Sequence, residues 1–285
     1  MTPDGRSGMV EFMTRWQHPG IRWNGRLWLL LTVTSAAACL AETPTPEALK
    51  AFDSYIRRVE SSLDSQHRSE AAFLVPQALN SGADERMRRG ELIIERIAPS
   101  AAPVLPGAML HHWRGTAFVA GATAADFEQL MRDFNAYPLR FSPQVVKAKV
   151  LTQRDDHYLA TLRVRQQHVI TVVLDTTCDV VFGRLDARRG YSISRSTKVS
   201  EIDSPGTAKE RALDSKAQHG FLWRLNTYWS YEERDGGLYM QIESVSLTRS
   251  IPNGLGWAIG PFIESIPRES LEFTLRSTCN ALRKK

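Results

Sequence analysis

Cysteine is scarce in this chain of 285 residues, which contains only three. No two of them form the C-x-x-C spacing that is typical of zinc sites and redox motifs. The chain also lacks a glycine-rich phosphate loop, an H-E-x-x-H helix and a nucleophile elbow. His111 and His112 are neighbours in an expected strand, so they point to opposite faces and cannot share one metal ion. The sequence therefore predicts no metal site, no cofactor and no catalytic residue.

The chain also lacks a strong excess of either positive or negative charge. The chain has 36 basic and 31 acidic residues, a net charge of +5. The first 41 residues hold four Arg and two acidic residues, so their removal would leave 32 basic against 29 acidic residues, or +3. This excess is too small to predict nucleic-acid binding. It leaves open a weak peripheral contact with an anionic membrane surface.

The longest apolar run, Leu27–Ala41, is too short for a membrane span, which needs about 20 apolar residues. A basic flank precedes the run and small residues end it, which predicts an export signal over residues 1–41. Three outcomes stay open for this segment. It is cleaved after Ala41, or Cys39 is lipidated as in bacterial lipoproteins, or the segment is an uncleaved anchor. The first two predict a protein of the periplasm or cell envelope.

An N-terminal helical appendage and linker is expected over residues 42–106. Thr45 and Pro46 suit the start of a helix. Apolar residues then recur at spacings of three and four, at Leu49, Phe52, Ile56, Val59 and Leu63. This stripe predicts an amphipathic helix that packs on the main domain, with partner binding as the alternative. Residues 65–90 predict a polar, loosely ordered connection, and residues 91–97 a short strand or helical turn.

A different pattern begins at residue 107 and predicts one domain over residues 107–285. The expected order is a strand at 108–122, a helix at 123–134 with Thr123 as its N-cap, an elbow at 137–143, strands at 145–154, 157–166, 168–182, 189–202, 220–233 and 237–250, and a long final helix. Hairpin turns are expected at residues 155–156 and 235–237. The fold class is therefore α+β, with a curved antiparallel sheet of about seven strands around the last helix.

Two segments in this order resemble the START and polyketide-cyclase (SRPBCC) superfamily of helix-grip proteins. Residues 121–143 are similar to the opening helix and elbow of that family, and residues 243–257 to its last strand and the entry to its last helix. The resemblance covers residues 107–285, and it extends to uncharacterised exported bacterial members. It implies a hydrophobic cavity between sheet and helix. Members carry lipids, sterols or aromatic molecules, and a minority catalyse cyclisations.

Alternation along the strands selects side chains for the wall of such a cavity. In the 220–233 strand, Trp223, Trp229 and Tyr231 share one parity, and Tyr158 leads the apolar parity of 157–166. The alternative interpretation is a core that these residues fill by themselves.

Two charged residues share the parity of apolar neighbours. By alternation, Arg195 shares a face of its expected strand with Tyr191 and Val199, and Glu243 shares a face with apolar residues of the last strand. If both point inward, each charge needs a partner, and a mutual Arg195–Glu243 pair would supply one. Such a pair would form the polar end of a ligand pocket. A structural ion pair, or a register error of one residue, is the alternative.

The last helix is expected to begin near Pro267, after a break at residues 265–266 that would let its start move as a lid. Leu271, Leu275, Cys279 and Leu282 form its apolar stripe. Export would permit a Cys178–Cys279 disulfide. Two buried thiols that act as small hydrophobic groups are the favoured alternative.

The sequence as a whole predicts a non-enzymatic protein that binds or carries a hydrophobic ligand, a lipid or an aromatic small molecule, outside the cytoplasm. A cyclase or aromatase that uses the same cavity is one alternative. An envelope interaction protein with a filled core is another. The sequence leaves the oligomeric state and the ligand undetermined.

Overall fold

The computed structural model describes residues 43–69, 73–74, 81–97, 105–167, 171–250 and 256–283, with residues 81 and 256–264 described in backbone only. All of these residues belong to one unit, Leu40–Lys285. The expected export signal and Cys39 lie outside the described residues.

The elements follow the expected order. They are α1 (Pro46–His67), α2 (Ser81–Arg88), β1 (Ile93–Arg96), β2 (Ala108–Ala120), α3 (Ala124–Arg132), η2 (Phe134–Ala136), α4 (Tyr137–Arg140), β3 (Val145–Arg154), β4 (His157–Gln167), β5 (Thr171–Arg184), β6 (Arg189–Asp203), β7 (Arg211–Ala212), η3 (Ser215–Ala217), β8 (Arg224–Arg234), β9 (Gly237–Arg249) and α5 (Gly256–Arg283). The α+β class is confirmed. The connection expected at residues 65–90 differs, because α1 continues to His67 and α2 follows it.

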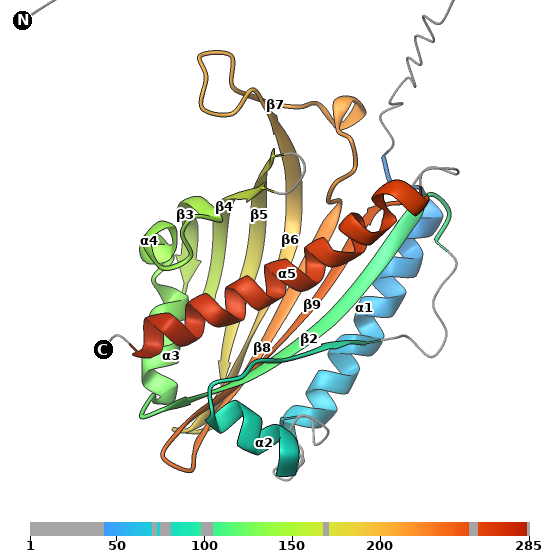
Figure 1. Ribbon diagram of the computed structural model, residues 1–285. Helices are drawn as coiled ribbons and strands as arrows, with labels where there is room; N and C mark the ends of the chain where they lie inside the picture. Colours follow the sequence, from blue (N-terminus) through green and yellow to red (C-terminus); the bar gives the residue numbers. More distant parts are fainter. Residues whose placement is uncertain are drawn as a thin grey trace, which may run out of the picture. The chain divides into compact units, whose positions relative to one another are not determined.

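One curved antiparallel sheet organises the domain (Figure 1). Its strand order is β1-β2-β9-β8-β6-β5-β4-β3, and β7 pairs with β6 off this path. The described sheet has nine strands where about seven were expected, because β1 of the N-terminal region and the short β7 join it. The strand that opens the main domain, β2, pairs with the last strand, β9, from Ala108↔Arg249 to Ala120↔Gly237.

Both predicted hairpin turns are present. Asp155 connects β3 to β4 with a φ of 50°, and Asp235 and Gly236 connect β8 to β9 with φ values of 55° and 75°. Positive φ is the conformation that tight two-residue hairpin turns require, and Asp and Gly reach it at low cost. These turns set the register of two strand pairs and therefore the face on which each side chain lies.

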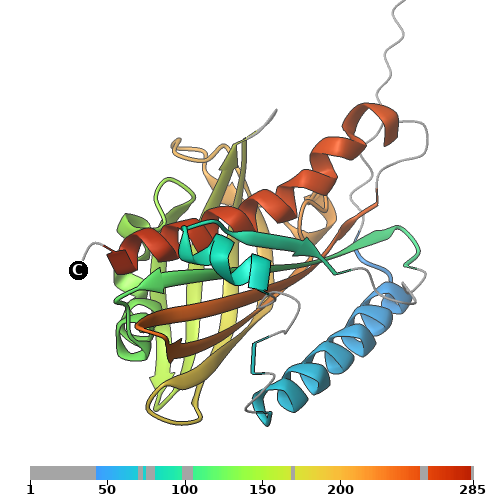
Figure 2. The same ribbon diagram turned by 60° about the horizontal axis from the view of Figure 1, so that its bottom comes forward.

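The sheet has an inner face, which α5 crosses, and an outer face, which α1 partly covers (Figures 1 and 2). Gly115 of β2 lies under α5, where a Cβ atom would come within 2.6 Å of Leu271 Cδ2. The missing side chain lets the helix approach the strand closely. The last helix differs from expectation at its start, because α5 is continuous from Gly256 through residues 265–266, where a break was expected.

The amphipathic helix α1 packs on the outer face as expected. The Thr45 side chain caps its first turn by accepting a hydrogen bond from the Ala48 N–H at 3.1 Å. Its apolar stripe, which includes Phe52 and Val59, joins one buried cluster with Val245 of β9. The stripe is therefore used inside the domain, and a partner would have to bind the exposed side of the helix.

Candidate functional site

The C-terminal half of α5 lies on a filled apolar part of the inner face. The predicted helix stripe, Leu271, Leu275, Cys279 and Leu282, is buried. Cys178 on β5 belongs to the same cluster. Both described cysteines are free thiols, which confirms the favoured alternative to a disulfide. Burial raises the pKa of Cys279 to about 11, so this thiol stays protonated at neutral pH.

Three of the predicted cavity-wall residues, Tyr158, Trp229 and Tyr231, lie in this filled part. All three are buried in the cluster under α5. Phe127 of α3 packs against the rings of Trp229 and Tyr231 at centroid distances of 5.3 and 4.7 Å. Phe182 meets the Tyr158 ring edge-on at 5.5 Å. At this end of the domain the aromatic side chains fill the space that a ligand would need.

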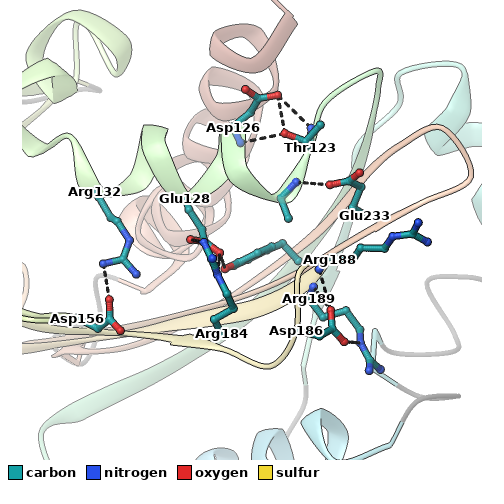
Figure 3. A network of polar contacts seen from close by, with 12 residues as sticks. Thr123, Asp126, Glu128, Arg132, Asp156, Arg184, Asp186, Arg188, Arg189 and Glu233 are labelled. Carbon is teal, nitrogen blue, oxygen red and sulfur yellow. Dashed lines mark hydrogen bonds and ion pairs between the residues drawn. The ribbon is translucent and has the colours of Figure 1, made fainter.

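A buried carboxylate closes the same end (Figure 3). Glu128 of α3 accepts a hydrogen bond from the Tyr231 hydroxyl at 2.7 Å and two contacts from the Arg184 guanidinium. Burial would raise the pKa of Glu128, but the hydrogen bonds from Arg184 and Tyr231 outweigh it and hold that pKa below its usual range. Burial and the Glu128 charge raise the pKa of Tyr231, so its hydroxyl remains a donor.

Further contacts tie α3 to the strand ends (Figure 3). The Arg132 guanidinium pairs with Asp156 at 2.7 Å, and the Ala124 N–H donates to the Glu233 carboxylate at 2.9 Å. Thr123 forms a capping box with Asp126, which confirms the predicted N-cap. The adjoining hairpin ends border a surface hollow of ≈ 360 Å³ lined by residues 186–189 and 232–234, which are all charged except Ala187. This network fixes α3 over the inner face.

The other half of the inner face has a different lining. By strand alternation and register, its side chains are mostly small and polar: His111, Thr176, Ser194, Ser196, Thr227, Ser244, Ser246 and Thr248. Among the apolar side chains between them, Leu174 is buried, whereas Val164, Val199 and Leu225 are only partly buried. This half lies toward the N-terminal part of α5. Small polar side chains and partly exposed apolar ones distinguish this half of the described inner face from the aromatic cluster.

Hydrogen bonds show how this polar half is held. The Gln166 amide of β4 donates to Ser270 Oγ of α5 at 2.6 Å, which fixes the helix over the strand. His111 Nε2 lies 3.1 Å from Thr248 Oγ1, so the histidine bridges β2 and β9. Gln166, His111 and the hydroxyl groups of this half are donors or acceptors of a kind that can hydrogen-bond a bound molecule.

The remaining predicted site residues, Arg195, Glu243, Tyr191 and Trp223, lie on the outer face, on the side of α1. The expected Arg195–Glu243 pair is wrong, because each residue has a different partner. Parity within each strand was correctly predicted for Glu243. Parity alone does not tell which of the two faces α5 covers, and this is why the assignment to a cavity failed.

Local irregularities explain two further differences. A register shift between Thr177 and Cys178 leaves one extra residue in β6, so Val199 lies on the inner face and Arg195 on the outer face. Trp223 precedes the first residue of β8, Arg224, so strand alternation does not govern its direction. Trp223 is buried in the cluster that includes α1.

Glu243 is the centre of a buried network under α1. Its carboxylate lies 2.9 Å from His112 Nε2 and accepts from Arg114 Nε at 2.8 Å, and the Tyr55 hydroxyl of α1 lies 2.8 Å from His112 Nδ1. Burial would raise the pKa of Glu243, but its hydrogen bond to His112 and the charge of Arg114 outweigh it and lower that pKa. Arg114 and Tyr55 were not predicted as partners, because nothing in the sequence indicates that β2 is adjacent to β9 or that α1 lies above both.

Arg195 and Tyr191 also serve the contact with α1. Arg195 Nε donates to the Glu60 carboxylate of α1 at 2.7 Å. The ring of Tyr191 stacks on His67, the last residue of α1, at a centroid distance of 4.7 Å. These contacts fix the helix on the sheet. They are structural roles, and they leave the inner face without the predicted charged pair.

The described residues contain no group of three His, Cys, Asp or Glu side chains that could hold a metal ion. Among the helices of this part of the chain, none is both long and apolar enough to cross a membrane.

Comparison with known proteins gives matches in structure alone. No protein-family model matches the chain, and no curated protein matches it. A START superfamily protein from Mycobacterium smegmatis is similar at a TM-score of 0.40 and 14% identity, over 61% of this chain and 97% of that one. A STAR-related lipid transfer protein from Xanthomonas axonopodis gives a TM-score of 0.42 and 17% identity, over 67% and 98%. The Zhui aromatase/cyclase from Streptomyces sp. R1128 gives 0.39 and 15%, over 62% and 93%.

The fold is α+β, with one long helix across a curved antiparallel sheet. The curved sheet and the long C-terminal helix are the features expected for a helix-grip architecture. The function of the present chain has to be argued from its own inner face.

Proposed function

We propose that this protein binds and carries a hydrophobic molecule, a lipid or an aromatic small molecule, between the inner face of the sheet and the N-terminal half of α5. The observation that carries this proposal is the division of the inner face. One half is filled by aromatic rings, and the other is lined by small hydroxyl side chains and the partly exposed Val164 and Leu225. Partly exposed apolar side chains offer surface that a hydrophobic ligand would bury.

A cyclase or aromatase reaction in the same space is the second candidate. In the polar half of the described inner face, His111 and Glu201 are the residues of types that commonly serve as an acid or base. The Glu201 carboxylate already accepts hydrogen bonds from the backbone N–H groups of His219, Gly220 and Phe221. This favours binding over reaction. The enzyme hypothesis would need turnover that is lost in His111→Gln.

We infer that the protein works outside the cytoplasm, because residues 1–41 have the order of an export signal: a basic flank, a short apolar run and small residues. Lipidation of Cys39 would hold the domain at a membrane surface. Mass spectrometry of the mature N-terminus would decide between cleavage after Ala41 and lipidation of Cys39. An intact N-terminus in protein from its own host would contradict export by cleavage.

The binding proposal is tested by adding bulk to the polar half. Ser246→Phe adds a ring on the inner face next to Leu225, its partner in β8. We expect this variant to lose binding of the fluorescent hydrophobic probe N-phenyl-1-naphthylamine by at least tenfold. Thr161→Phe, on the opposite face of β4, is the matched control and should keep the affinity.

Native mass spectrometry of the protein from its own host gives an independent measurement. A co-purified lipid or aromatic molecule in the wild type, absent in Ser246→Phe, supports the proposal. If the wild type binds no probe and carries no molecule, the carrier hypothesis fails. That result would support the interaction hypothesis, in which the core is filled and a partner binds the exposed side of α1.

A further inference from the structure

The two strands at one edge of the sheet carry positive charge and no negative charge. β3 (Val145–Arg154) contains Lys147, Lys149 and Arg154, and β4 (His157–Gln167) contains Arg163 and Arg165. Neither strand contains Asp or Glu. These 21 residues therefore carry five positive charges, as many as the net charge of the whole chain.

The register places these charges on one face. Lys147 lies opposite Arg163 and Lys149 opposite Thr161, on the outer face of the sheet and away from the buried residues of β4. Like charges directly opposite in a sheet cost stability. Asp175 and Glu210 neutralise Arg163, whereas Lys147, Lys149 and Arg165 form no ion pair within the described residues. An uncompensated basic surface remains, and α1 lies over the other part of the outer face.

Exposed aliphatic side chains border this basic surface. Leu139 on α4 is 77% exposed, and Val146 and Leu151 on β3 are 43% and 46% exposed. β3 is the last strand of the sheet, with one unpaired edge, and α4 packs next to it. The register shifts at 145/147 and 150/152 add one residue each, at Val146 and Leu151. Lysines beside exposed aliphatic groups are the combination that interfacial membrane binding uses.

We propose that the outer face of β3 and β4, with the exposed aliphatic residues of β3 and α4, docks on an anionic phospholipid bilayer. Charge complementarity and the aliphatic border select this partner. Single-stranded nucleic acid, the other common polyanion, is bound through exposed aromatic rings, and Tyr158, the aromatic residue of these two strands, is buried. The basic side chains of β3 and β4 lie on the opposite side of the sheet from α5, so a docked protein would keep its ligand space free.

Vesicle co-sedimentation tests the proposal with the full chain. The probes are vesicles of phosphatidylcholine alone and with 30% phosphatidylglycerol. At about fivefold per basic residue, the triple variant Lys147→Gln, Lys149→Gln, Arg165→Gln should lose on the order of 100-fold in partitioning to the anionic vesicles. A matched triple variant removes the same charge from the exposed side of α1, at Lys50, Arg57 and Arg58, and should lose much less.

A dye attached to a single residue shows which surface contacts the lipid, even if residues 27–41 also bind the membrane. In a Cys39→Ser background, an environment-sensitive dye on Leu151→Cys should shift to the blue on anionic vesicles, and the same dye on Ser61→Cys of α1 should not. The proposal is overturned if the wild type ignores anionic vesicles, if both triple variants lose binding equally, or if the dye at residue 151 stays in water. It is also overturned if heparin or DNA binds the basic surface more tightly than the vesicles do. None of these measurements requires a ligand, so the docking surface can fail while the proposed carrier function stands.

Discussion

Replacing Glu243 with Gln tests whether the buried network fixes α1 on the sheet. The Glu243 side chain is 4% exposed. One of its carboxylate oxygens lies 2.8 Å from Arg114 Nε, and the other lies 2.9 Å from His112 Nε2. Breaking one partner of a buried charged pair costs about 3–5 kcal/mol, because the other charge stays buried without compensation. Gln keeps the shape and one acceptor oxygen, so we expect a loss near the lower bound, about 3 kcal/mol. Urea unfolding followed by circular dichroism at pH 7 measures it.

The same variant carries a pH signature. The folded-state pKa of Glu243 is lowered from 4.5, so its contribution is fully present above pH 4.5 and is lost as the pH falls through the lowered value. The stability difference between wild type and Glu243→Gln should therefore shrink below pH 4.5. Glu272→Gln changes a partly exposed residue that pairs with Arg276 at 2.8 Å, and it should change stability by less than about 1 kcal/mol. A Glu243→Gln loss under 1 kcal/mol, or one that persists at pH 3, would refute this role.

Two further predictions concern the filled half of the interior. Leu275→Ala removes a fully buried side chain of α5 and should lower the free energy of unfolding by about 2–5 kcal/mol; a loss under 1 kcal/mol in urea unfolding would contradict the packing. Cys178 and Cys279 should not react with a thiol reagent at pH 8 in the folded, Cys39→Ser protein, and both should react in 6 M guanidinium. Fast reaction of either thiol in the native state would contradict their burial.

The fold was largely predictable because its signals are local. Alternation found most of the strand borders, Asp235 and Gly236 marked a turn by composition, and the spacing of the α1 stripe gave a correct helix. The pairing of β1 with β2 at Ile93↔Thr116 could not be predicted, because four residues carry too short an alternation to select a partner strand. The break expected near Pro267 was wrong, since the assigned helix continues through the position where proline removes one backbone hydrogen bond.

The site was less predictable than the fold. Parity groups residues into two sets but does not say which set faces the long helix, so Trp229 was assigned to the face that α5 covers, although to a cavity wall and not to the filled cluster, and Glu243 was assigned to the wrong face. An extra residue in β6 moved Val199 away from the parity of Arg195, and a bulge of that kind has no reliable sequence signal. The polar lining drew no prediction at all, because isolated residues such as Ser246 are also typical of exposed strand positions.

The charges that were predicted for the ligand pocket instead hold the protein together, and this affects which ligand the proposed space would accept. Arg195 and Glu243 fix α1 on the outer face. At the closed end of the inner face, Arg184 donates to the Glu128 carboxylate. In the polar half, the Glu201 carboxylate accepts hydrogen bonds from the backbone of the loop at residues 219–221. A ligand with a buried charge would find no counter-charge on this described surface that is not already paired, and such a charge is costly to bury. The hydroxyl lining therefore favours a neutral or weakly polar molecule, selected by shape and by a few neutral hydrogen bonds.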